Sequence, residues 1–207
     1  MLKIQHVQMN FKNRTIIKDA TLSLRSGDII HITGPNGCGK STLFKIIVGI
    51  YQPTSGKVSL DADDQLGALI ENPGFLEFED LKTNLKFLAN LKNHFDEQYT
   101  SELCLNLGLD FENHQHLSKY SVGMRQKAGI IQTIMEGQNI VLLDEPTRGL
   151  DAEALQTFVK LINALQRQGC GIMIASHDLV RGINYTQHYI RVTAKLDSQF
   201  LVDDPAD

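Results

Sequence analysis

Apolar and polar residues alternate along the first part of the chain with the spacing of β-strands. Residues 2–10 and 21–25 follow this alternation, and short polar segments around Lys12 and Ser26 interrupt it. Because successive side chains of a strand point to opposite faces of a sheet, the pattern predicts antiparallel strands. The next segment, residues 28–33, is mostly apolar and rich in β-branched residues, which is typical of a buried strand.

The middle of the chain has the spacing of helices instead. Between about Leu81 and Gly123 the strand signals vanish and leucines recur at helical intervals, at Leu81, Leu85, Leu88, Leu91, Leu103, Leu105, Leu107 and Leu109. This periodicity predicts helices that each bury one face. We therefore expect a helical subdomain at about residues 75–125, inserted into a domain that also contains strands.

Strand patterns surround this insertion on both sides. A turn at 52–56 precedes a predicted strand at 57–60, and apolar runs predict strands at 140–143 and 171–175. An amphipathic helix predicted at 152–168 joins the last two as a crossover between parallel strands. The 207 residues suffice for one substantial core. We expect a single α/β domain over 1–207, with a mainly parallel core sheet, an N-terminal antiparallel β subdomain and the helical insertion.

A glycine-rich segment follows the predicted strand at 28–33 and precedes an apolar helix at 43–48. It matches the P-loop pattern GxxxxGK[ST] at every required position, through Gly34, Pro35, Asn36, Gly37, Cys38, Gly39, Lys40, Ser41 and Thr42. Backbone N–H groups of such a loop turn inward around phosphates, and the positive end of the following helix dipole faces the same charge. The alternative is a glycine-rich turn with an accidental Lys-Ser. We expect all these residues to bind a nucleotide triphosphate.

Three side chains have specific tasks in this prediction. Lys40 is a mobile cation that reaches the β- and γ-phosphates, which makes it a candidate catalytic residue. Ser41 offers a hydroxyl ligand to Mg²⁺, and Thr42 is expected to hydrogen-bond further back along the phosphate chain.

The predicted strand at 140–143 ends in two carboxylates, Asp144 and Glu145. A P-loop ATPase holds its metal ion from the side opposite the loop with such a strand. We expect Asp144 to bind Mg²⁺ directly or through water, and Glu145 to accept a proton or orient the attacking water. The alternative is that Glu145 is an acidic residue at the end of a strand and has no catalytic role.

Bulk composition narrows the function classes. The formal net charge of −4 and the pI near 6.0 do not indicate the basic surface that nucleic acid binding requires. Three widely spaced cysteines favour a reducing compartment over a disulfide framework. The sequence has neither a run of 18 apolar residues nor the pattern of a signal peptide. We expect a cytoplasmic chain that reaches a membrane only through a partner.

The segment from Tyr120 to Gln126 carries a family resemblance. Together with the P-loop and the Asp144-Glu145 strand end, it resembles the Leu-Ser-Gly-Gly-Gln signature of ABC ATPases through Ser121 and Gly123. Its Tyr-Ser-x-Gly-Met-Arg-Gln form is similar to the bacitracin and lantibiotic export group. Taken alone, Ser-x-Gly is also an ordinary helix N-cap.

Further segments follow in the order that this resemblance implies. Gly149-Leu150-Asp151 is similar to the D-loop near the dimer seam, and His177 lies where the family has its switch histidine. Phe11 occupies the place of the aromatic residue that stacks on adenine, with a core phenylalanine as the alternative. Glu71 stands where most members have the Q-loop glutamine. It retains oxygen ligands for Mg²⁺ but adds a negative charge close to the phosphates.

The resemblance implies a P-loop NTPase of the ABC type that uses ATP and Mg²⁺. Two chains close head to tail, as a homodimer here, so that Ser121 and Gly123 of one contact the γ-phosphate held by the other, while Glu145 and His177 direct water onto it.

It also implies separate integral membrane subunits that dock near 71–90, with Phe75, Leu76 and Phe78 as an apolar anchor. The chain would then lie on the cytoplasmic face of the membrane and power transport, with export favoured. The rival functions are a soluble ABC ATPase of translation or DNA repair and a non-ABC P-loop kinase.

Overall fold

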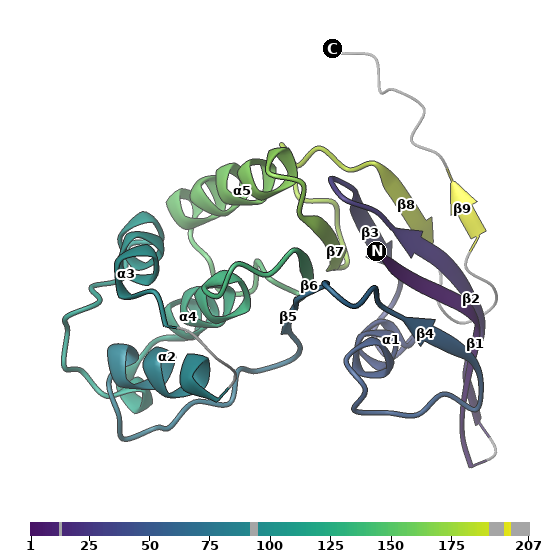
Figure 1. Ribbon diagram of the computed structural model, residues 1–207, viewed down its shortest axis with the longest axis horizontal. Helices are drawn as coiled ribbons and strands as arrows, with labels where there is room; N and C mark the ends of the chain where they lie inside the picture. Colours follow the sequence, from purple (N-terminus) through teal and green to yellow (C-terminus); the bar gives the residue numbers. More distant parts are fainter. Residues whose placement is uncertain (13, 92–94, 191–196, 200–207) are drawn as a thin grey trace.

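An antiparallel sheet and a mainly parallel sheet form the frame of the protein (Figure 1). The structure, a computed structural model, describes residues 1–12, 14–91, 95–190 and 197–199. The antiparallel sheet has the order β2-β1-β4 and consists of β1 (Leu2–Phe11), β2 (Arg14–Leu24) and β4 (Ser55–Ser59). The predicted antiparallel pairing is confirmed, although β2 begins well before the alternating segment at 21–25.

The larger sheet has the order β5-β6-β7-β3-β8-β9. Its strands are β3 (Ile29–Thr33), β5 (Leu66–Leu69), β6 (Ile140–Asp144), β7 (Gly171–Ala175), β8 (Gln187–Ile190) and β9 (Asp197–Gln199). All pairings are parallel except that between β8 and β9. The expected mainly parallel core sheet is confirmed.

Helices cover this sheet and extend away from it. The helix α1 (Lys40–Ile47) follows β3, and α5 (Ala152–Arg167) connects β6 to β7 as predicted. The inserted part comprises α2 (Leu81–Asn90), α3 (Glu97–Asn106), the short 3-10 helix η1 (Leu117–Lys119) and α4 (Val122–Ile134). Figure 1 shows α2, α3 and α4 grouped at one end of the molecule and the antiparallel sheet at the other.

The core lies on both faces of the parallel sheet. Along β6, Val141 and Leu143 join a hydrophobic cluster with α2 to α5, whereas Ile140 and Leu142 join a second cluster with α1 and the antiparallel sheet. This two-sided burial explains why β6 and β7 have continuous apolar sequences. Because β3, β5, β6 and β7 are parallel, their carboxyl ends meet at one edge, where Asp144 ends β6 and the P-loop, Glu71 and His177 follow the other strands.

In the part of the chain that the structure describes, no helix combines the length and the apolar character needed to cross a membrane.

Candidate functional site

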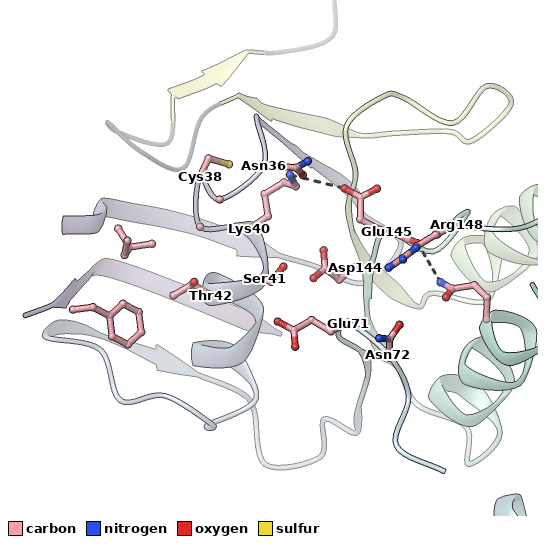
Figure 2. A pocket seen from close by; sticks show the side chains of 15 residues that line it. Asn36, Cys38, Lys40, Ser41, Thr42, Glu71, Asn72, Asp144, Glu145 and Arg148 are labelled. Carbon is pink, nitrogen blue, oxygen red and sulfur yellow. Dashed lines mark hydrogen bonds and ion pairs between the residues drawn. The ribbon is translucent and has the colours of Figure 1, made fainter. Parts of the chain in front are cut away.

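A cavity of about 470 Å³ lies at the carboxyl edge of the parallel sheet (Figure 2). Its walls come from the P-loop, the end of β6, the segment after β5 and the end of β1. The lining residues are Phe11, Ile16, Asn36, Gly37, Cys38, Gly39, Lys40, Ser41, Thr42, Glu71, Asn72, Gln126, Asp144, Glu145 and Arg148. The structure thus brings most of the predicted site residues to one cavity.

The P-loop has the backbone geometry that phosphate binding requires. Gly39 adopts a φ of 108° at the N-cap of α1, a conformation that favours glycine, and Lys40 begins the helix. Residues 36–42, which include the first turn of α1, line the cavity. The N–H groups of a first helical turn have no partner within the helix, so this turn is suited to bind phosphate.

Lys40 is held between the loop and the end of β6. Its ammonium donates a 2.8 Å hydrogen bond to the Gly34 carbonyl and lies 3.9 Å from the Glu145 carboxylate, with only 6% of the side chain exposed. A cation so deeply placed is suited to a multiply charged anion such as a triphosphate.

Two residues expected to hold the metal ion, Ser41 of the P-loop and Asp144 at the end of β6, lie next to each other in this cavity. Asp144 is 5% exposed, and burial raises its pKa above the ordinary value, while a hydrogen bond with Ser41 counteracts that shift. A hydroxyl beside a carboxylate is a donor set that fits Mg²⁺, which usually takes one or two protein ligands together with substrate phosphates and water. No cluster of three or more His, Cys, Asp or Glu suited to a metal occurs among the described residues.

Glu145 extends into the cavity from a strained backbone. Its φ of 47° is unusual for a residue with a side chain, and such strain occurs often at functional sites. Two hydrogen bonds fix this conformation: its N–H donates to the Ala175 carbonyl at 2.7 Å, and its carbonyl accepts from Gln126 Nε2 at 3.1 Å. Figure 2 shows its carboxylate facing Lys40.

His177 lies beside the P-loop, at the end of β7. Its Nε2 is 2.6 Å from Asn36 Oδ1, and its carbonyl accepts a 2.8 Å hydrogen bond from the Thr33 hydroxyl. His177 and Glu145 also line a neighbouring cavity of about 340 Å³. The two residues expected to direct water are thus close together, although their roles remain predictions.

Phe11 also lines the main cavity. It is 41% exposed and contacts the edge of Tyr51, with the ring centroids 5.4 Å apart. The alternative of a core phenylalanine is therefore wrong. An exposed ring at this place has a free face for a base, which keeps the stacking role as a prediction.

Ser121 is the N-cap of α4 and Gly123 lies in its first turn, and neither lines this cavity. The Ser121 hydroxyl caps the helix by accepting from the Met124 N–H, so the N-cap alternative describes its local role correctly. A Cβ at Gly123 would lie 2.3 Å from the Gly149 carbonyl oxygen, so only glycine allows this approach. The expected contact with a γ-phosphate on another chain stays a prediction.

The expected apolar anchor is partly wrong. Phe75 is buried, because it packs into the hydrophobic cluster that includes residues of α2 to α4, whereas Leu76 and Phe78 are exposed. Phe87 on α2 is exposed as well.

Sequence reasoning did not assign four polar or charged residues of this region. Asn72, Gln126 and Arg148 line the cavity, and Lys45 forms an ion pair with Glu71. Gln126 ends the signature-like segment, and Asn72 and Arg148 lie next to motifs, so their positions in the sequence could have indicated a place in the site. Lys45 offered none, because its partner is 26 residues away in the sequence.

Comparison with known proteins agrees with this arrangement. Residues 17–148 match the family described as ABC transporter. The chain is 33% identical over 188 residues to the uncharacterized ABC transporter ATP-binding protein YdbJ of Bacillus subtilis, which covers 86% of this chain and 61% of YdbJ. It is 30% identical over 186 residues to the lantibiotic transport ATP-binding protein SrtF of Streptococcus pyogenes, covering 86% of this chain and 81% of SrtF.

Solved structures share the fold. An ATP-binding subunit of an ABC transporter superposes with a TM-score of 0.86 at 24% identity, over 97% of this chain and 90% of that one. A dimeric bacterial ABC transporter cassette superposes with a TM-score of 0.84 at 21% identity, over 99% of this chain and 100% of that one.

Proposed function

The chain belongs to the ABC transporter family, and we propose that it is the ATP-binding and ATP-hydrolysing subunit of a transporter whose membrane-spanning subunits are separate chains. The observation that carries this proposal is the single cavity in which the P-loop, Asp144 and Glu145 face one another. An ATPase needs this combination of a phosphate cradle, a metal ligand and a base.

Each residue of the cavity has a task in the proposed reaction. The P-loop N–H groups and Lys40 would hold the phosphates, while Ser41 and Asp144 would hold Mg²⁺, with Glu71 as a further candidate ligand. When bound, Mg²⁺ neutralises charge on the phosphate oxygens. Glu145 accepts a proton from the attacking water, and His177 keeps that water in line through its place beside Asn36.

A second copy of the chain completes the site in this proposal. Ser121 and Gly123 lie apart from the cavity of their own chain, and Ser121 and Val122 are exposed. The signature-like segment is therefore free to reach the γ-phosphate bound to a partner, and the dimer of a similar cassette is consistent with such pairing. ATP would then join the two chains, and its hydrolysis would release them.

The exposed residues Leu76, Phe78 and Phe87 form the proposed docking surface for the membrane subunits. They follow Glu71 in the chain, and a bidentate ion pair between Glu77 and Arg125 ties this segment to α4. A movement of residues at the nucleotide site can thus be transmitted to the docking surface through the short segment that connects them. Attachment here would hold the chain at the cytoplasmic face of a membrane.

Export is the favoured direction. Support comes from the signature-like segment of the bacitracin and lantibiotic type and from the similarity to SrtF, whose name assigns it to lantibiotic transport. Relatives named for zinc import and taurine import match at 30% identity as well.

Capture of the tagged chain from detergent-solubilised membranes tests the proposal. We expect an integral membrane protein to copurify and ATP to be hydrolysed by the complex. Recovery with ribosomes or DNA and without a membrane protein would instead support the rival soluble ATPase.

A further inference from the structure

Glu71 introduces a charge problem at the nucleotide site. The cavity is lined by three carboxylates, Glu71, Asp144 and Glu145, but by only two cationic side chains, Lys40 and Arg148. A negatively charged triphosphate entering this cavity would be repelled by the Glu71 carboxylate.

Lys45 supplies the compensating charge from outside the lining of the cavity. It belongs to the last turn of α1, and its ammonium lies 2.5 Å from Glu71 Oε1. The Lys45 side chain is 20% exposed and that of Glu71 is 60% exposed. Water is therefore kept away mainly from the lysine of this ion pair. Dissolved salt should screen the pair less than it screens two charges on an open surface.

Both partners are held in place by the backbone. The Lys45 carbonyl accepts hydrogen bonds from the N–H groups of Ile50 and Tyr51, at 2.8 and 3.1 Å. Its ammonium also lies 5.8 Å from the centroid of the Tyr51 ring, a cation–π distance. Glu71 has a φ of 59°, a left-handed backbone conformation that is uncommon for residues other than glycine. This conformation sets the direction in which its side chain leaves the backbone.

We propose that Lys45 is a positioning residue that neutralises Glu71, so that the cavity accepts a triphosphate despite a carboxylate in the Q-loop position. This inference rests on the proposed function, because it concerns the same nucleotide site. Lys45 then acts only through Glu71. Its removal should harm nucleotide binding when Glu71 is charged and should matter little when residue 71 is neutral.

A double-mutant cycle measures this dependence directly. The affinity for a ribose-labelled fluorescent ATP analogue is determined in excess EDTA, so that no metal ion takes part, for the wild-type chain, Lys45→Met, Glu71→Gln and the double variant. We expect Lys45→Met to weaken binding by about fivefold, in the range of a partly exposed charge pair. Combined with Glu71→Gln, the same substitution should change affinity by less than about twofold.

A matched control separates this effect from a general loss of charge. Lys82 on α2 also pairs with carboxylates, those of Glu97 and Glu112, so Lys82→Met removes an equivalent lysine away from the cavity and should leave affinity unchanged. If Lys45→Met does not fold, as judged by circular dichroism, Lys45→Gln takes its place in the cycle.

Two results would overturn the inference: an unchanged affinity of Lys45→Met, or an equal loss in the Glu71→Gln background, which would mean that Lys45 acts without Glu71. Failure of the wild-type chain to bind the analogue even when Mg²⁺ is supplied in place of EDTA would instead refute the proposed function itself.

Discussion

At the scale of single residues, the site places charged groups where the fold alone would disfavour them. Asp144 is buried at the end of β6 and Glu145 has a left-handed backbone. Such features lower stability and persist when they serve a function. Removing charged side chains from the nucleotide site is therefore expected to raise the free energy of unfolding of the protein and to lower its activity.

Asp144→Asn tests this trade-off. Burial raises the Asp144 pKa, so ionisation is less favourable in the folded chain than in the unfolded one. The asparagine variant should therefore be more stable near neutral pH by about 1 kcal/mol and should lose Mg²⁺-dependent hydrolysis. Urea unfolding measures the first effect and phosphate release the second.

The pH dependence of that gain has a defined sign. A carboxyl whose folded pKa is raised contributes stability below its unfolded pKa and loses that contribution as pH rises through the folded pKa. The advantage of Asp144→Asn should thus shrink as the solution is acidified and Asp144 becomes protonated. A gain that stayed constant on acidification, or a less stable variant at neutral pH, would contradict this explanation.

At the scale of elements, a close contact between the start of α4 and the turn before α5 constrains the signature-like segment. Gly123→Ala would place a Cβ 2.3 Å from the Gly149 carbonyl oxygen, so one of the two segments must move. We expect a loss of about 2 kcal/mol in the free energy of unfolding, as for other overpacked sites. Thermal or urea denaturation measures it.

Gly74→Ala is the matched control for this prediction. A Cβ at Gly74 meets nothing within 4 Å, so the same substitution should change stability by less than about 0.5 kcal/mol. Equal effects of the two substitutions would show that the close approach at Gly123 does not constrain the helix.

The elements also show how far the sequence could predict the fold. The strand predicted at 171–175 coincides with β7, and that at 140–143 with most of β6, because continuous apolar runs identify strands buried on both faces. By contrast, β5 is only Leu66–Leu69 and contains Gly67, which is required because a Cβ there would lie 1.9 Å from the Thr133 carbonyl oxygen. That requirement comes from α4 and has no local signal.

The candidate site, like the fold, could be predicted in part from the sequence. Motifs with fixed spacing identified Lys40, Ser41, Asp144 and Glu145, which the structure brings to one cavity. Contacts between distant segments, such as Lys45 with Glu71 and Gln126 with the Glu145 carbonyl, depend on tertiary packing and were not predictable.

At the scale of the whole molecule, the nucleotide cavity and the proposed docking surface belong to different parts of the fold. The cavity lies at the edge of the parallel sheet, whereas Phe78 precedes α2 in the helical part. Substitutions on the docking surface should therefore uncouple membrane attachment from ATP binding.

Phe78→Asp tests this separation, because Phe78 is 78% exposed. We expect the fraction of the chain retained in washed membranes to fall by about tenfold, as for an aromatic residue at the centre of an interface, while nucleotide affinity is unchanged. Leu105→Asp is the control, since Leu105 on α3 is equally exposed. Unaltered retention of Phe78→Asp, or an equal loss with Leu105→Asp, would argue against this surface.

The most direct test of the whole account is the rate of ATP hydrolysis by Glu145→Gln. The variant keeps the shape of the side chain and removes its ability to accept a proton, so turnover should fall by about 100-fold or more while ATP still binds. Glu153→Gln, an exposed acid in the first turn of α5, should retain the wild-type rate. Undiminished turnover by Glu145→Gln would contradict the role assigned to this cavity.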